Sequence, residues 1–340
     1  MSDTTHSPSP DSGIRFGVTD TGERLPVIDI THSAFAISSP EQEMADRMAA
    51  YLEESAAREH MSDSVRAMVT NALQQSLLGR ALTAAAGGHV DGLTIYRLKL
   101  GPENLGSGYS EIDRRIAGSF PAWAARLRLQ SMAQLLAGGL RPVLDRDRER
   151  PLIFLDIAGG PASDALNALL LIRAADADLL ASRRTRIHVL DLDAAAPSFG
   201  KSSLAALQAQ GGKLAPVDVT FDRVPYDWND VNPLRSQLSQ AQEMGALVAV
   251  SSEGGLFDYG SDDAIAANLD AVRRTAVPDT IVVGSFTRDD GPDRAVRIAQ
   301  IATVPRSLDQ CRALAARAGW GVEEVVTGPF NRLLRLRPAP

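Results

Sequence analysis

The chain of 340 residues has a single cysteine, Cys311, which excludes an intrachain disulfide and is typical of a reducing cytoplasm. It has no apolar run that approaches the roughly 20 residues needed to span a bilayer. Residues 1–13 are rich in Ser, Thr, Pro and Asp, and they lack the basic start and apolar core of a signal peptide. We therefore expect a cytoplasmic protein without a membrane partner, beginning with a disordered tail over residues 1–20.

Signals of metal or nucleophilic catalysis are also missing. No G-x-S-x-G, P-loop or H-x-x-x-H motif occurs, and the histidines have no ligand spacing to one another or to the cysteine, so we expect no dedicated metal site. His188 lies inside an apolar run and is interpreted as a sheet residue rather than a base. The other histidines are His6, His32, His60 and His89.

An excess of positive charge is absent as well. The formal net charge is −7, and arginines are scattered among acids, so the composition gives no reason to expect capture of nucleic acid. With 44% hydrophobic residues the chain can bury a sizeable core, and its length favours two domains. We expect a small-molecule substrate, and the composition leaves a homo-oligomer open.

What the sequence does contain is a strand, turn, helix and strand pattern over residues 151–193. Residues 152–157 form a short apolar run that predicts a buried parallel strand, and residues 158–162 predict a tight turn. A capped helix follows, and a second apolar strand ends at Asp191. In an open parallel sheet, a ligand sits outside the carboxyl ends of the strands, where small residues let the backbone approach it.

The turn favours one cofactor class over another. A dinucleotide site would show G-x-G-x-x-G here, whereas the chain reads A-G-G-P-A-S. The run resembles instead the first motif of class I S-adenosylmethionine (SAM) dependent methyltransferases, an acid followed by G-x-G-x-G. Ala158, Gly160 and Ala162 stand at the glycine positions, and Pro161 departs from the motif because proline has no backbone N–H.

The resemblance implies a SAM site built from several loops. Asp191 would accept hydrogen bonds from both ribose hydroxyls, with Asp193 as the next candidate. The loop that includes Asp227 and Trp228 would meet the adenine, although Trp228 could equally plug the sheet edge. The implied cofactor-binding residues are Asp156, Ala158, Gly159, Gly160, Pro161, Asp191, Leu192, Asp193, Tyr226, Asp227, Trp228, Ser252, Glu253, Gly254, Tyr109 and Arg114.

Residues 252–259 carry a further resemblance, to the E-G-L-x-x-Y segment of the leucine carboxyl methyltransferase and polyketide O-methyltransferase group. It implies that Glu253 lies near the methionine ammonium of SAM, where a carboxylate gains a charge-assisted hydrogen bond. A helix-capping acid is the alternative for Glu253. Arg114, beside Tyr109, would meet the SAM carboxylate, or the two residues mark an exposed helix start.

The α/β pattern continues to the end of the chain. The last two strands are joined by three residues only, which requires an antiparallel pair. A parallel sheet that ends in such a hairpin resembles the class I methyltransferase fold, so we expect an α/β, Rossmann-like, mostly parallel sheet over residues 146–340. The later strands are expected at residues 217–221, 246–251, 280–284, 322–327 and 331–336.

Residues 21–145 are expected to be mainly helical and, by resemblance, to form a lid that covers the cofactor and builds the substrate pocket. Residues 93–100 alternate enough to be a strand, and an extended crossing is the alternative. A helix that begins near residue 62 should turn its apolar side chains inward. Those side chains are Val65, Met68, Val69, Ala72 and Leu73.

The function that the sequence favours is SAM-dependent methyl transfer to a small molecule, including natural products, with no catalytic residue identified. Methyl transfer from a sulfonium is a direct displacement, so the protein mainly aligns the reactants and excludes water. Two alternatives stay open. One is a SAM-binding scaffold that does not methylate, and the other is an NAD(P)-dependent oxidoreductase, which the turn and the hairpin disfavour.

Overall fold

The computed structural model describes residues 13–38, 41–85, 88–290 and 302–340. Residues 1–12 of the expected disordered tail lie outside these ranges. The expectation of disorder is wrong for residues 13–20, which include a strand. Strand β1 (Phe16–Val18) pairs antiparallel with β2 (Arg24–Pro26). The amide of Val18 also donates a hydrogen bond of 2.8 Å to the Ser202 hydroxyl, so this segment is docked on the rest of the protein.

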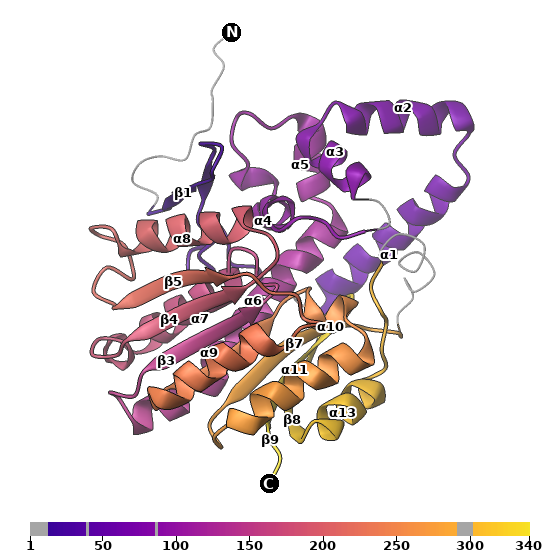
Figure 1. Cartoon of the computed structure of the whole chain (residues 1–340). Helices are drawn as coiled ribbons and strands as arrows, with labels where there is room; N and C mark the ends of the chain where they lie inside the picture. The colour runs from indigo at the N-terminus through magenta and orange to yellow at the C-terminus, as the bar shows by residue number, and fades with distance from the viewer. Residues whose placement is uncertain (1–12, 39–40, 86–87, 291–301) are drawn as a thin grey trace.

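The centre of the fold is a seven-stranded sheet with the order β5-β4-β3-β6-β7-β9-β8 (Figure 1). Strands β3 to β7 are parallel, and the chain builds outward from β3 to β5 before it returns to β6 on the other side of β3. This reversal places a switch point at the carboxyl ends of β3, β4 and β6, where open α/β sheets bind ligands. The strands are β3 (Leu152–Ile157), β4 (Thr185–Leu190), β5 (Val219–Val224), β6 (Leu247–Ser252), β7 (Ile281–Thr287), β8 (Trp320–Thr327) and β9 (Asn331–Pro338).

The sheet ends in an antiparallel hairpin. Strand β9 pairs antiparallel with both β7 and β8, and the amide of Gly328 donates to the carbonyl of Asn331 at 2.8 Å to close the turn between β8 and β9. The expected fold class, a mostly parallel α/β sheet with an antiparallel C-terminal hairpin, is therefore confirmed.

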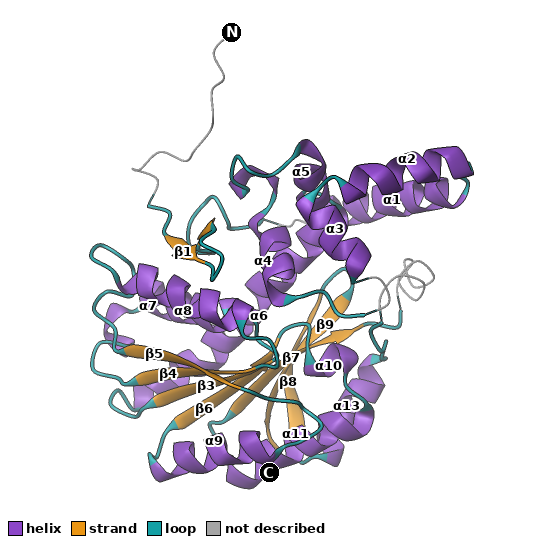
Figure 2. Cartoon of the chain, turned by 45° about the horizontal axis from the view of Figure 1, so that its top comes forward, coloured by secondary structure: helices purple, strands orange, loops and turns teal. Residues whose placement is uncertain are grey.

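Helices cover both faces of the sheet (Figure 2). The side chains of β3 alternate between two cores, with Leu152 and Phe154 in one and Ile153 and Leu155 in the other, each at most 3% exposed. The first core is covered by α6 (Phe120–Arg146), α7 (Ser163–Ala175) and α8 (Ala195–Gln208), and the second by α9 (Asn232–Glu243), α11 (Asp262–Thr275) and α13 (Leu308–Arg317). A short helix, α10 (Leu256–Tyr259), follows β6.

The N-terminal region is mainly helical, as expected, but the strand predicted at residues 93–100 is wrong. This segment is helix α4, because Asp91 caps it by accepting hydrogen bonds from the Thr94 amide at 2.8 Å and the Thr94 hydroxyl at 2.6 Å. No helix among the described residues is long and apolar enough to cross a membrane. The helices are α1 (Glu41–Glu59), α2 (Asp63–Gln74), α3 (Leu77–Ala84), α4 (Gly92–Leu100) and α5 (Glu111–Ala117).

Helix α6 joins the N-terminal region to the sheet. Its first part packs among the N-terminal helices through Ala122 and Leu129. Its later residues Met132, Leu136 and Leu140 are fully buried in the same core as β3. A boundary at residue 145 thus follows a helix that both regions need, so the N-terminal region is not a separable unit at that point.

Helix α2 buries none of the residues expected to face inward, so that expectation is wrong, although Ala72 and Leu73 at its end are partly covered. Val65, Met68 and Val69 are 43%, 71% and 44% exposed, and none of the residues of α2 is buried. Figure 1 shows α1 and α2 extending away from the sheet as an arm. Amphipathic spacing identifies an apolar face, but it does not determine what covers that face.

The approach of α10 to β7 generates a prediction. A β-carbon at Gly284 would lie 2.3 Å from the ring of Phe257, which is 1% exposed. Because a buried ring cannot yield easily, we expect Gly284→Ala to lower the free energy of unfolding by about 1–3 kcal/mol in a urea titration. Gly106→Ala is the matched control, since a β-carbon there meets nothing within 4 Å. Equal stability of the two variants would contradict this packing.

Candidate functional site

The turn after β3 has an unusual backbone. Ala158, Gly160 and Ala162 have φ angles of 52°, 53° and 52°, and the two alanines are the only non-glycine residues with positive φ in the described part of the chain. A left-handed conformation costs an L-residue about 1 kcal/mol, so each alanine stores strain that a glycine would not. Backbone strain of this kind concentrates at functional sites.

Asp156 lies beneath this turn rather than at its surface. It is 0% exposed, and a β-carbon at Gly159 would lie 2.1 Å from the Cγ atom of Asp156. The lack of a side chain at residue 159 therefore lets the turn close directly over the carboxyl group. In this arrangement Asp156 supports the turn from below, and a ligand above the turn would not touch it.

Asp156 shares its buried position with Asp164 of α7 and Ser251 of β6. Neither oxygen of Asp156 has a donor in hydrogen-bonding geometry among the described residues, and Asp164 accepts one hydrogen bond of 2.9 Å, from the Ala165 amide. Burial, and then the neighbouring Asp164, raise the pKa of Asp156 well above its ordinary value. Burial raises the pKa of Asp164 as well. Protonation of Asp156 lowers the cost of burying the two carboxyl groups side by side.

Asp191 reaches the turn from the end of β4. Its Oδ2 atom accepts a hydrogen bond of 2.9 Å from the Gly160 amide, and its Oδ1 atom accepts one of 2.9 Å from the Asp193 amide. Burial raises the pKa of Asp191, and these two amides oppose the shift. The structure therefore brings together two residues that the sequence analysis assigned to one site. Asp193 instead caps α8 through the amides of Ala195 and Ala196, and Leu192 is 70% exposed.

The loop after β5 divides its side chains between core and edge. Tyr226 is 3% exposed and donates its hydroxyl to Asn268 of α11, so it is a core residue rather than one at a ligand surface. Asp227 closes its own loop by accepting from the Asn229 amide at 2.9 Å. Trp228 is half-buried, and its ring lies 6.4 Å from the ring of His89.

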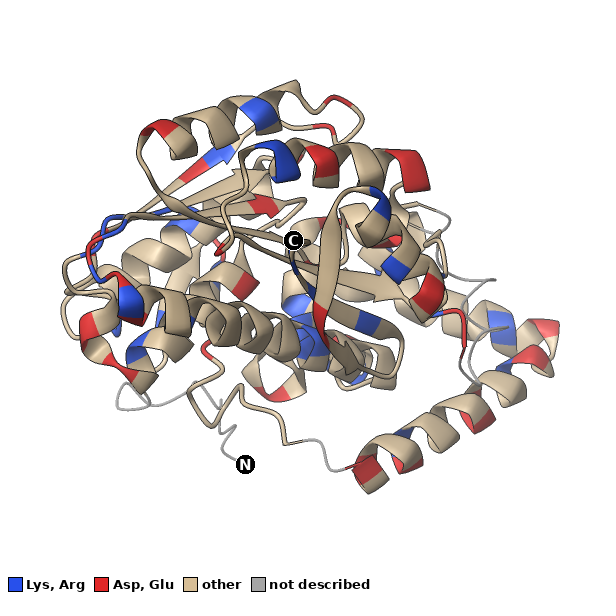
Figure 3. Ribbon diagram, turned by 90° about the horizontal axis from the view of Figure 1, so that it is seen from below, with Lys and Arg blue, Asp and Glu red and all other residues tan. Residues whose placement is uncertain are grey.

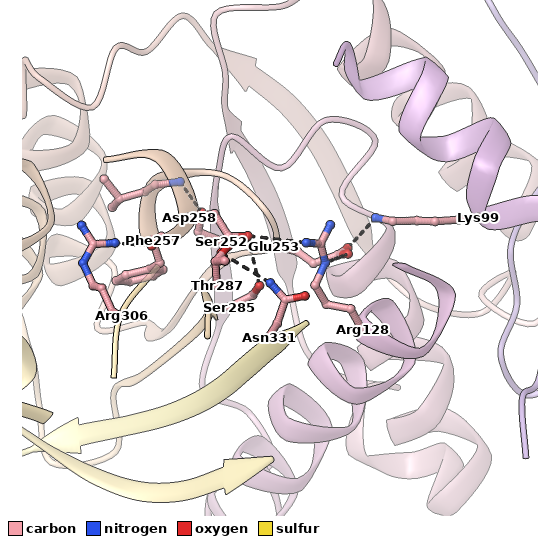
Figure 4. Close-up of polar contacts among 11 residues, drawn as sticks. Lys99, Arg128, Ser252, Glu253, Phe257, Asp258, Ser285, Thr287, Arg306 and Asn331 are labelled. Atoms are coloured by element: carbon pink, nitrogen blue, oxygen red, sulfur yellow. Dashed lines mark hydrogen bonds and ion pairs between the residues drawn. The ribbon is translucent and has the colours of Figure 1, made fainter. Parts of the chain in front are cut away.

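Glu253, after β6, is held by two cations from the N-terminal region (Figure 4). Its Oε2 atom lies 2.7 Å from the ammonium of Lys99 in α4, and its Oε1 atom lies 3.0 Å from the guanidinium of Arg128 in α6. The side chains of Glu253 and Lys99 are 6% and 8% exposed, and that of Arg128 is 17% exposed. Both carboxylate oxygens thus already have charged partners, and Glu253 does not cap a helix.

The same network continues into the sheet. Arg128 also lies 3.5 Å from Asp258 of α10, which accepts hydrogen bonds from Thr287 at 2.8 Å and Ser285 at 3.3 Å (Figure 4). Burial raises the pKa of Asp258, and the guanidinium of Arg128 opposes the shift. The two cations and two carboxylates balance, so the network is neutral when all four groups are charged. We refer to Lys99, Arg128, Glu253 and Asp258 as the ion-pair clamp.

Tyr109 and Arg114 are engaged elsewhere. Tyr109 donates its hydroxyl to Glu23, which also pairs with Arg97 at 2.6 Å. Arg114 donates to the carbonyls of Pro102, Leu105 and Gly106 at 2.7, 3.0 and 2.9 Å. Both side chains therefore stabilise loops of the N-terminal region. Neither belongs to the set of residues around the turn after β3 (residues 158–162), which we call the glycine turn.

The sequence analysis did not assign Lys99, Arg128, His89 or Tyr259 to the site. Lys99 and Arg128 precede Glu253 by 154 and 125 residues, and nothing local marks a pairing at such separation. His89 was treated only as a metal ligand, for which it had no companions. Its contact with Tyr259, at a ring distance of 4.3 Å, arises from tertiary structure alone.

Comparison with known proteins bears on the fold. No family model and no curated protein matches the chain. Among solved structures it is similar to a possible exported protein from Bordetella parapertussis, with TM-score 0.51, 17% identity, and 89% of this chain and 100% of that chain covered. The mitomycin 7-O-methyltransferase follows with TM-score 0.41, 15% identity and coverage of 80% and 72%. The magnesium protoporphyrin IX methyltransferase from Synechocystis PCC 6803, with bound SAH, has TM-score 0.41, 14% identity and coverage of 66% and 92%.

At these identities the likeness concerns the fold. The strand order, with its reversal at β3 and the antiparallel β9 between β7 and β8, is the decisive observation. The chain has the class I methyltransferase fold. The turn after β3, Asp191 and the loop after β6 lie at the carboxyl edge of the sheet, the edge at which open α/β sheets generally bind ligands. Within the described ranges, no cluster of three or more His, Cys, Asp or Glu side chains could hold a metal ion.

The buried acid pair predicts a pH dependence of stability. Because the folded-state pKa of Asp156 is raised, its proton stabilises the fold at low pH, and that stability is lost as pH rises from about 4 through the raised pKa. Asp156→Asn cannot lose this proton. We expect its unfolding free energy in urea to fall less than that of the parent between about pH 5 and pH 8. Glu53→Gln, at an exposed position, should keep the parental slope, and an unchanged slope for Asp156→Asn would refute the assignment.

The ion-pair clamp predicts a large effect of removing its central charge. Glu253→Gln keeps the size of the side chain but leaves Lys99 and Arg128 without their shared carboxylate, so unfolding free energy should fall by about 3–5 kcal/mol. Glu54→Gln breaks the exposed pair of Glu54 with Arg58, whose side chains are 67% and 59% exposed, and should change stability by less than about 1 kcal/mol. Similar losses in the two variants would show that the clamp contributes no more than a surface pair.

Proposed function

We propose that this protein binds SAM at the carboxyl edge of the sheet and transfers its methyl group to a small-molecule acceptor. The observation that carries the proposal is the hydrogen bond between Gly160 and Asp191 at the switch point. It joins the turn that approaches a ligand most closely to an acid at the end of the neighbouring strand. This pairing of backbone and acid suits a ribose, whose hydroxyl groups are donors.

The residues present fit the cofactor in charge and in shape. Asp191 is only partly buried and its carboxylate can accept from hydroxyl groups in addition to the amides that it already binds. Trp228 offers a half-buried ring at the end of β5, which suits the face of adenine.

The chemistry that SAM supplies when bound is a methyl group on a sulfonium, which an acceptor takes by direct displacement. This chain's residues would hold the reactants in line and exclude water, which are sufficient tasks when the acceptor ionises readily. The ion-pair clamp places α4 and α6 beside the loop after β6. Those helices would then form the wall of the acceptor pocket, in keeping with a lid.

A SAM-binding scaffold without methyl transfer remains the second candidate. The strained alanines at two positions of the turn favour it, because they restrict the backbone where the resembled motif has glycine. An oxidoreductase that uses NAD or NADP is disfavoured by the A-G-G-P-A turn, which lacks the G-x-G-x-x-G pattern, and by the antiparallel C-terminal hairpin. Figure 3 shows basic and acidic residues intermingled along the ribbon, which supports a small molecule rather than nucleic acid as the partner. A cytoplasmic location is part of the proposal.

Calorimetric titration with SAM, S-adenosylhomocysteine, NAD and NADP tests the function. We expect saturable binding of the first two ligands only. Asp191→Ala should weaken that binding at least tenfold, because each lost hydrogen bond to a charged group contributes about 1.5–3 kcal/mol. Asp222→Ala, on the exposed side of β5, should bind like the parent. Binding of NAD without any response to SAM would overturn the proposal, and parental affinity in Asp191→Ala would move the ribose contact elsewhere.

A further inference from the structure

Residues 88–92 cross the carboxyl edge of the sheet and lead into α4, of which Gly92 is the first residue. We call this segment the strap. One end of it contacts the glycine turn after β3 and the start of α8, and the other contacts α10 and the loop after β5. The strap therefore spans the loops at the ends of four neighbouring parallel strands, which are the loops that build the proposed cofactor site.

At one end, the strap lies directly on the turn. A β-carbon at Gly92 would lie 2.7 Å from the Cβ atom of Ala196 and 3.4 Å from the Cα atom of Gly160. Backbone meets backbone here, so no ligand group fits between Gly92 and Gly160. Gly92 therefore contacts the residue whose amide holds Asp191, the acid proposed to take the ribose.

At the other end, His89 lies among aromatic rings. Its ring centre is 4.3 Å from that of Tyr259, with the planes tilted by 52°, and 6.4 Å from that of Trp228, tilted by 59°. These separations are those of attractive aromatic pairs. The three rings come from the strap, α10 and the loop after β5, so their meeting is a property of the tertiary structure. His89 itself is exposed and can leave without breaking a core.

We propose that the strap occupies the place of the nucleoside, with the His89 ring in the seat of the ligand's flat nitrogen heterocycle. The ligand class is an adenine nucleoside that carries a thioether or sulfonium, so the inference rests on the proposed function. Binding then requires the strap to leave the turn. The apparent affinity of the protein then equals the affinity of the open site multiplied by the fraction of molecules in which the strap is open.

The anchoring of α4 is consistent with a strap that moves at one end. Lys99, near the end of α4, is pinned to Glu253 by a buried ion pair of 2.7 Å. The strap contacts the loops of the sheet through rings and through van der Waals contact at Gly92, which are weaker than a buried ion pair, and the hydrogen bonds of Asp91 run to Thr94 of α4 itself. The low-stability end of a helix is where a ligand can displace structure at least cost.

The first test removes the His89 ring. In calorimetric titration with S-adenosylhomocysteine, His89→Ala should bind about three- to tenfold more tightly than the parent, the range that corresponds to the loss of one or two aromatic contacts that compete with the ligand. His60→Ala, at the exposed end of α1, is the matched control and should bind like the parent. Weaker or equal binding by His89→Ala would show that His89 does not compete with the ligand, which overturns the proposal.

The second test fixes the strap in place. The double variant Gly92→Cys with Ala196→Cys should form a disulfide after a shift of about 1 Å, because disulfides hold Cβ atoms about 3.5–4.5 Å apart. The native Cys311 does not interfere, since it is buried and burial raises its thiol pKa to about 12. We expect the oxidised variant to lose at least tenfold in affinity for S-adenosylhomocysteine and the reduced variant to regain it. A thermal melt of both forms establishes that each is folded.

The outcomes separate this inference from the proposed function. Equal binding of S-adenosylhomocysteine by the oxidised and reduced double variant would contradict the strap proposal and leave the cofactor assignment intact. Absence of binding in the parent, together with binding by His89→Ala, would support both. Absence of binding in the parent, in His89→Ala and in the reduced double variant would overturn the cofactor assignment, and the strap proposal would fall with it.

Discussion

The conformation of the loops at the carboxyl edge of the sheet depends on one constraint, the close approach of backbone segments around the turn after β3. Residue 159 has no side chain because the Asp156 carboxyl group fills that space, and Gly255 has none because its β-carbon would lie 2.6 Å from that of Ala158. The turn after β6 thus packs on the turn after β3, and both lie at the switch point of the sheet. Packing this tight leaves few arrangements open to the loops, which is how a site is held in shape before a ligand arrives.

Charge, rather than apolar contact alone, connects this edge to the N-terminal helices. The ion-pair clamp brings α4 and α6 to the loop after β6, where its buried charges neutralise one another. Helix α6 adds an apolar connection because its later residues lie in the core of the sheet. The ion-pair clamp and α6 together hold the N-terminal region against the sheet, whereas α2 extends away from it with Val65, Met68 and Val69 exposed.

The two alanines of the turn set this chain apart from the glycine-rich motif that it resembles. Alanine reaches φ angles near 52° only when the surrounding structure imposes them. Here that structure includes the strap on one side and the turn after β6 on the other. The turn is thus packed from two sides, by Gly92 and by Gly255, and under the strap proposal the first of these contacts must open before a ligand binds.

Local patterns determined the elements of this protein, and tertiary structure decided which of them form the site. Strand periodicity, the turn and the short final connection were enough to predict the sheet, its hairpin and the proximity of Gly160 to Asp191, because parallel strands bring their carboxyl ends to one edge. The same patterns misread α4 as a strand and α2 as buried. They could not show that Tyr226 and Asp156 face inward, or that Lys99, Arg128 and His89 reach the edge. Those positions depend on contacts between different elements, from Tyr226 with Asn268, 42 residues apart, to Lys99 with Glu253, 154 residues apart, and no local spacing encodes them.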